Sequence, residues 1–269
     1  MDCISYYICF ENYVVILNFY QLKTIMKFHS MLKMQLLGIS IAFLLFTFSA
    51  CKKENSSAPQ TQLTEENSDA SIFKTLAGDT TKLILRPGPE LGQDVYIQAY
   101  GFETDVNYSS VPELPIKSWT NGGAPIQNRS FIKFTKLSDI PANATILSAH
   151  LYLYGLSQSI STPGGNAGSN SCWVQRVTGS DWDESTLTWE NGPASTTDDE
   201  ASLPASTSTW NYNVKINVTA MVQKMVANPS TNFGFCILPK QTGTFNEVVF
   251  ASAESTTPAL RPRLIVFFK

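Results

Sequence analysis

Residues 129–155 constrain the fold more than any other stretch, because they contain two alternating runs joined by a short link. In the first run, residues 129–134, a two-residue period separates Ile132 from Arg129 and Lys133. The second run, residues 145–154, alternates small apolar side chains with His and Tyr. The link contains Pro, Asp and Asn, which favour turns. Such a stretch predicts half of a β-sandwich, with one dry face and one polar, aromatic face.

Similar short runs recur to the end of the chain, separated by connections rich in Pro, Gly, Asn and Ser. We expect strands at 81–85, 94–100, 129–134, 145–154, 171–178, 214–218, 234–238, 247–252 and 263–268. The composition, 12% aromatic and only 15% charged, is typical of a β-rich protein. This spacing predicts an all-β fold, a jelly-roll-like antiparallel β-sandwich, rather than alternating strands and helices.

One helix interrupts the strands. In residues 219–227 the apolar side chains of Met221, Val222, Met225 and Val226 form a narrow stripe, and an Asn-Pro pair follows. We expect this short helix to cap an open end of the sandwich.

The first part of the chain reads as an export signal. Lys27 and Lys33 precede an apolar run at 36–48, which ends in Ser-Ala-Cys51 and is too short for a comfortable membrane span. This pattern resembles a bacterial lipoprotein signal peptide over residues 26–50, with Cys51 as the lipidated residue. An ordinary cleaved signal or a tail anchor are the alternatives. The expected location is the cell envelope, on the outer membrane or the cell surface.

Two flanking segments complete the predicted organisation. Residues 1–25 fit no part of an export signal, and we interpret them as a segment that lies upstream of the true translation start. Residues 51–71 have almost no large apolar side chain, which predicts a flexible tether. The folded domain is therefore expected at 72–269.

Charge and cysteine content limit the function classes. A formal charge of −3 and a pI near 5.5 provide no broad basic field, so nucleic acid is not an expected partner. Cys172 and Cys236 are the two cysteines within the expected domain. They could form a disulfide in an exported protein, or remain as two buried free thiols, and the sequence leaves both open.

The polar sides of the two central runs supply candidate ligand-binding residues. If these two strands pair, Arg129, Lys133, His150, Tyr152 and Tyr154 form one cationic, aromatic platform. Either Gln175 or Arg176 joins it, depending on the parity of the strand at 171–178. Such a platform suits a carboxylated sugar such as a uronate. A solvated face, or aromatic residues packed against a loop, is the alternative.

Tryptophans supply further candidates. Trp182 begins a segment, residues 182–189, that holds a second tryptophan and two carboxylates. It could stack on sugar rings, or form an Ω-like loop pinned by its own tryptophans. Trp119 lies in a long connection, where binding residues concentrate, but a lone tryptophan is more often a loop anchor.

Metal binding and ion pairs are less defined. A structural calcium site is one option, with carboxylates available from Asp94, Asp105, Asp198, Asp199 and Glu200, although no EF-hand spacing is present. Near the last turn, Glu254, Arg261 and Arg263 are expected to form ion pairs that lock the closing strand.

Four segments in order carry a resemblance to a known family: residues 121–155, 174–193, 217–235 and 250–268. Their motifs include W-x-E-x-T-x-T-W, N-V-T-x-x-V-Q and a closing S-x-E…R-P-x-L strand. This ordered set resembles the DNRLRE domain, also described as family 96 of carbohydrate-binding modules. The resemblance implies a non-catalytic β-sandwich attached to exported proteins that handle acidic or cell-wall polysaccharides.

The expected function is therefore that of a lipid-anchored, non-catalytic polysaccharide-binding protein, which could act beside a separate glycan-degrading enzyme. A polysaccharide lyase using Arg129, Gln175, His150 and Tyr152 is one alternative. A glycosidase pair of Asp183 and Glu184 is weaker, since adjacent carboxylates rarely flank one bond from opposite sides. A structural or adhesion module without a glycan ligand is another alternative.

Overall fold

The computed structural model describes residues 9–10, 13–14, 70–74 and 79–269. The chain divides into two compact units, Met1–Thr61 and Gln62–Lys269. In the first unit, β1 (Cys9–Phe10) pairs antiparallel with β2 (Tyr13–Val14). The predicted signal peptide, Cys51 and most of the predicted tether lie outside the described residues. Among the described residues, no helix has the length and apolar character needed to cross a membrane.

The second unit contains a seven-stranded antiparallel sheet with the order β10-β9-β12-β7-β6-β13, to which β5 is added on β7. Its strands are β5 (Gln93–Tyr100), β6 (Glu113–Asn121), β7 (Ala124–Lys133), β9 (Cys172–Val177), β10 (Ser195–Leu203), β12 (Phe235–Pro239) and β13 (Asn246–Ala251). The strand β7 is central, because β5 pairs along one edge while β6 and β12 share the other. The sheet therefore divides into two arms at β7.

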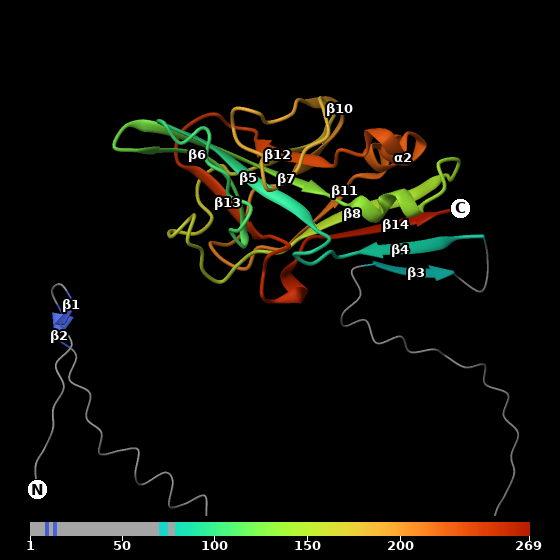
Figure 1. Ribbon diagram of the computed structural model, residues 1–269, viewed down its shortest axis with the longest axis horizontal. Coiled ribbons are helices and arrows are strands. Elements are labelled where there is room, and N and C mark those ends of the chain that lie inside the picture. Colours follow the sequence, from blue (N-terminus) through green and yellow to red (C-terminus); the bar gives the residue numbers. More distant parts are fainter. Residues whose placement is uncertain (1–8, 11–12, 15–69, 75–78) are drawn as a thin grey trace, which may run out of the picture. The chain divides into compact units, whose positions relative to one another are not determined.

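A second sheet has five antiparallel strands in the order β11-β8-β14-β4-β3. Its strands are β3 (Ala70–Lys74), β4 (Thr81–Leu85), β8 (Ile146–Leu153), β11 (Val214–Asn217) and β14 (Arg263–Phe268). Figure 1 shows β8, β14, β4 and β3 side by side in this layer, with β5, β6 and β7 in the other. The expected all-β sandwich with one helix is confirmed.

The core fills the space between the two sheets. Alternate side chains of β8 (Ala149, Leu151 and Leu153) have 0% exposure, and so do Leu264 and Val266 of β14. Across from them lie inward residues of the larger sheet, among them Ile116, Ile132, Phe235, Ile237 and Phe250. Burying such side chains is the main favourable contribution to the fold.

The helix α2 (Thr219–Ala227) closes part of this core. It inserts Met221, Val222, Met225 and Val226, the four side chains of the predicted apolar stripe. Gln223 ties the helix to the start of β8, because its side-chain oxygen accepts a hydrogen bond from the backbone N–H of Ile146 at 2.8 Å. The predicted helix and its buried face are confirmed.

The two central runs of the sequence do not pair with each other. The first run belongs to β7 in the seven-stranded sheet, and the second belongs to β8 in the five-stranded sheet. The link between them, which includes the 3-10 helix η2 (Thr135–Asp139), crosses from one sheet to the other. The single cationic, aromatic platform required these two strands to pair, so it does not form. At the link the chain crosses to the other sheet instead of turning back as a hairpin.

The two cysteines of the second unit are free and buried. They lie on the neighbouring strands β9 and β12, but Cys172 faces the core between the sheets and Cys236 faces the outer side of the larger sheet. Opposite orientation prevents a disulfide. Burial raises the pKa of both thiols to about 12, which keeps them protonated and unreactive at neutral pH.

We therefore expect reductant to leave the stability of residues 62–269 unchanged. The melting temperature with dithiothreitol should equal that without it, and a thiol reagent should label the protein only after denaturation. A melting temperature that falls on reduction would contradict the free-thiol arrangement.

Candidate functional site

The outer faces of the two sheets are the surfaces on which a sandwich can hold a ligand, and here they differ. The outer face of the seven-stranded sheet carries a second apolar cluster that includes Val95, Ile97, Phe131, Val177, Trp182, Leu187 and Cys236. Two of these residues, Trp182 and Leu187, come from the loop at 180–192 and not from the sheet. We call this surface the loop-covered face, because the loop lies over it.

Trp182 anchors that loop. Its side chain is only 7% exposed, and its ring meets Phe131 of β7 edge to face at a centroid distance of 5.8 Å. The indole N–H donates a hydrogen bond to the backbone oxygen of Phe233 at 2.8 Å. A buried tryptophan whose only polar atom is satisfied has a packing role, so its face is not available for a sugar ring.

Short-range hydrogen bonds hold the rest of the loop in shape. The carboxylate of Asp183 accepts hydrogen bonds from the N–H and the hydroxyl of Ser185, and Asn191 accepts one from the N–H of Thr188. The side-chain amide of Asn107 donates to the backbone oxygens of Glu184 and Leu187. Sequence analysis predicted either a sugar-stacking segment or an Ω-like loop here, and these contacts match the Ω-like loop.

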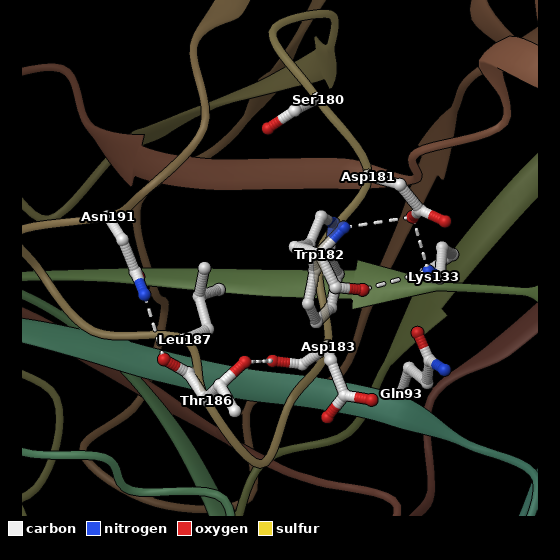
Figure 2. A pocket seen from close by; sticks show the side chains of 9 residues that line it. All are labelled: Gln93, Lys133, Ser180, Asp181, Trp182, Asp183, Thr186, Leu187 and Asn191. Atoms are coloured by element: carbon white, nitrogen blue, oxygen red, sulfur yellow. Dashed lines mark hydrogen bonds and ion pairs between the residues drawn. The ribbon is translucent and has the colours of Figure 1, made fainter.

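A groove of about 570 Å³ lies on the loop-covered face, lined by Gln93, Lys133, Asp181, Trp182 and neighbouring loop residues. Figure 2 shows Lys133 pointing back toward the loop, where its ammonium donates to Asp181 at 2.6 Å and to the backbone oxygen of Trp182 at 3.0 Å. Arg129 stacks over the ring of Trp189 at 4.8 Å. Both cations expected to bind a ligand are therefore engaged in holding the loop.

The outer face of the five-stranded sheet has a different character. His150 and Tyr152 of β8 point outward, Tyr154 follows directly after β8 with the same parity, and the register places Lys215 of β11 and Arg263 of β14 on either side of Tyr152. We call these five residues the tyrosine face. The guanidinium of Arg263 lies 4.7 Å from the ring centroid of Tyr152 and 5.9 Å from that of Tyr154. The ammonium of Lys215 lies 5.9 Å from the Tyr152 ring.

Charge is segregated between the sheets. The strands of the five-stranded sheet contain Lys and Arg but no Asp or Glu. Among the residues that the structure describes, no carboxylate lies within ion-pair distance of Lys215 or Arg263. Partial burial, and then the nearby Lys215, lower the pKa of His150, so its imidazole is neutral at pH 7. The tyrosine face is therefore a cationic, aromatic surface without acidic neighbours on its own strands.

The remaining predicted residues are scattered. Gln175 faces the loop-covered side and exchanges hydrogen bonds with Ser195 and Glu200, whereas Arg176 has the opposite parity and is half-buried. Trp119 lies within the strand β6 and not in a connection as expected, and its ring meets Phe245 edge to face at 5.0 Å. None of these three belongs to the tyrosine face.

The structure adds Lys215 and Arg263 to the site, neither of which the sequence analysis placed there. Arg263 was expected in an ion pair with Glu254, but no described ion pair involves Glu254, Arg261 or Arg263. Outward parity is readable from the sequence in the two central runs, but not in the strand at 171–178. The neighbouring positions of β8, β11 and β14 depend on pairings between distant segments.

Three carboxylates meet at another place. Asp94 is 2% exposed, its N–H donates to Glu184, and its side chain accepts from the N–H of Ala253, next to Glu254. Burial, followed by the charge of Glu254, raises the pKa of Asp94 well above its usual range. Burial raises the pKa of Glu184 to about 7. Of the residues proposed for calcium, Asp94 alone lies in this group.

The second unit is an antiparallel β-sandwich, and the outer face of its smaller sheet carries tyrosines and cations, as in a protein that binds a ligand on an open sheet face. Residues 90–267, more than half of the chain, match the model of Carbohydrate-binding module family 96. The chain belongs to this family and carries a carbohydrate-binding module. No curated protein matches the chain.

Replacing Trp182 tests whether the loop is architectural. Trp182→Ala should lower the free energy of unfolding by about 3–5 kcal/mol, because it empties the contact with Phe131. Trp182→Phe should cost less, since the ring contact persists and one hydrogen bond is lost. Chemical denaturation measures both. Thr186→Ala, an exposed change in the same loop, is the control, and Trp182→Ala protein as stable as this control would contradict the packing role.

Proposed function

We propose that this chain is an exported, non-catalytic binding protein for an acidic polysaccharide, and that the polysaccharide lies along the tyrosine face. The observation that carries the proposal is the five-stranded sheet itself, on which two outward tyrosines are bridged by Arg263 while every charged side chain in the strands is basic. Membership of a carbohydrate-binding family supports the coarser part of the proposal.

The chemistry of a uronate chain suits this surface. The apolar C–H side of a pyranose ring stacks on an aromatic ring, and its carboxylate accepts charge-assisted hydrogen bonds from Arg or Lys. Tyr152 has a cation on each side, from Lys215 and from Arg263, so a sugar over its ring has a cation within reach along either direction. The neutral imidazole of His150 adds a group that both donates and accepts hydrogen bonds to hydroxyls.

The arrangement of the side chains favours binding without turnover. A lyase built from Arg129, Gln175, His150 and Tyr152 requires all four in one cleft, but the first two lie on the outer side of one sheet and the last two on the outer side of the other. Asp183 is occupied within its own turn, and Glu184 accepts a hydrogen bond from the backbone of Asp94. These positions give no pair of carboxylates that faces a common bond.

Binding experiments with matched variants test the tyrosine face. Residues 62–269 should bind polygalacturonate or polymannuronate without cleaving it, and the affinity should fall as salt is raised, because the contacts are charge-assisted. Arg263→Gln should weaken binding about tenfold, the effect of losing one charged hydrogen bond of about 1.5 kcal/mol. Tyr152→Ala should weaken it by a similar factor, since the stacking surface is lost. Calorimetry measures each affinity.

Lys136→Gln is the control for charge alone, because Lys136 is exposed and lies outside the five-stranded sheet. Its affinity should match that of the parent protein. Equal losses in Lys136→Gln and Arg263→Gln would reduce the effect to net charge, and appearance of unsaturated sugar products would overturn the non-catalytic role.

We further propose that Cys51 is lipidated and anchors the domain to the cell envelope, on the basis of the apolar run at 36–48 and the Ser-Ala-Cys sequence that ends it. In a bacterial host, the full chain should fractionate with membranes and incorporate labelled fatty acid. Cys51→Ala should abolish the label and release the protein from membranes. Retention of both properties in Cys51→Ala would contradict the anchor.

A further inference from the structure

Arg86 and Arg263 are neighbours at one end of the five-stranded sheet. In the adjacent strands β4 and β14 (Figure 1), Leu85 lies opposite Leu264, and both of these side chains are buried in the core. Because side chains alternate along a strand, the next pair in this register, Arg86 and Arg263, points to the outer side of the sheet. Arg86 directly follows β4, and Pro87 favours an extended backbone at the residue before it, which preserves this parity.

The two guanidinium groups have no acidic partner. No ion pair among the described residues involves either arginine, and their Nε–H groups are buried without donating a hydrogen bond to a described residue. The next outward positions of the same two strands are Ile84 and Ile265, so neither strand places a carboxylate beside the pair. Both arginines are half-buried, so part of each side chain remains open to solvent. Like charges on neighbouring strands repel each other, and a bound anion would offset that repulsion.

The two arginines continue a row of outward side chains on the tyrosine face. The register places Tyr152 opposite Arg263, and Lys215 opposite Tyr152. Arg86, Arg263, Tyr152 and Lys215 therefore follow one another across β4, β14, β8 and β11, over a distance of about 14 Å at the usual strand spacing. Arg86 precedes residues 90–267, which match the family model, so the family match assigns no role to it.

We propose that Arg86 and Arg263 together bind one anionic group of the polysaccharide, a carboxylate or a sulfate ester, and that the polysaccharide crosses the strands along this row. This role rests on the function proposed above, because Arg86 adds a specificity-determining residue to the same face. A guanidinium binds an oxyanion through two parallel hydrogen bonds, so two of them can enclose one such group. A sugar ring can then stack on Tyr152 while the acidic group of its neighbour lies between the arginines. A neutral polysaccharide leaves both charges unpaired and binds more weakly.

Calorimetry of residues 62–269 with polygalacturonate and with dextran sulfate tests the arginine pair. The polymer that the parent protein binds more tightly identifies the anionic group as carboxylate or sulfate. Arg86→Gln should weaken binding of that polymer about tenfold, the effect of losing one charged hydrogen bond. Because both arginines hold one group, the variant that combines Arg86→Gln with Arg263→Gln should lose less affinity than the product of the two single losses.

Lys82→Gln is the matched control, because Lys82 is an outward cation of the same strand but lies opposite Phe267, in a different row. Its affinity should match that of the parent protein. Equal losses in Lys82→Gln and Arg86→Gln would overturn the proposed row. Independent losses in the combined variant would overturn the shared anionic group.

Small anions separate this proposal from the function on which it rests. If the parent protein binds neither polymer, the proposed function fails, and sodium glucuronate and sodium sulfate then test the arginine pair alone. In nuclear magnetic resonance spectra, the Nε–H signals of Arg86 and Arg263 should shift saturably with one of these salts. Sodium chloride at equal ionic strength should not produce that shift. Absence of a saturable shift with both salts would overturn the pair as an anion site.

Discussion

The contact between Trp182 and Phe131 decides which surface of this sandwich is open. Each sheet has two faces, and the common core buries one face of each. The tryptophan and the loop around it bury a second face of the larger sheet, with the Lys133–Asp181 ion pair and the Arg129–Trp189 stack holding the loop down. The outer face of the five-stranded sheet has no such cover from that loop, so its outward side chains are open to solvent.

Charge follows the same division. The chain has a formal charge of −3, but the strands of the five-stranded sheet contain no acidic residue. In the seven-stranded sheet, the single strand β10 contains three, Asp198, Asp199 and Glu200. A protein with a net negative charge can therefore present a locally basic surface to an anionic polymer. Coulomb attraction falls off within about 10 Å at moderate salt, so the local surface matters more to binding than the net charge.

Local patterns in the sequence predicted most elements well. The helix at 219–227 and the strands at 81–85 and 263–268 have the expected bounds, because their periodicity and flanking residues act over a few positions. The strands β3, β6 and β10 were not predicted, and β3 (Ala70–Lys74) begins inside the expected tether at 51–71. Pro115 interrupts the pattern of β6, and β10 is polar and acidic along its length, so tertiary pairing outweighs weak strand propensity in both.

The sequence by itself determined the helix and its buried stripe, the alternation of the two central runs, and the motifs of the family to which the module belongs. Only the tertiary structure decided which strands became neighbours. It separated Arg129 and Lys133 from His150, Tyr152 and Tyr154, turned Trp182 inward, and brought Arg263 and Lys215 beside Tyr152. Strand pairing depends on contacts between segments that are distant in the sequence. The entropic cost of closing the loop between two strands changes only slowly with its length, so neither this cost nor a local pattern selects the partner strand.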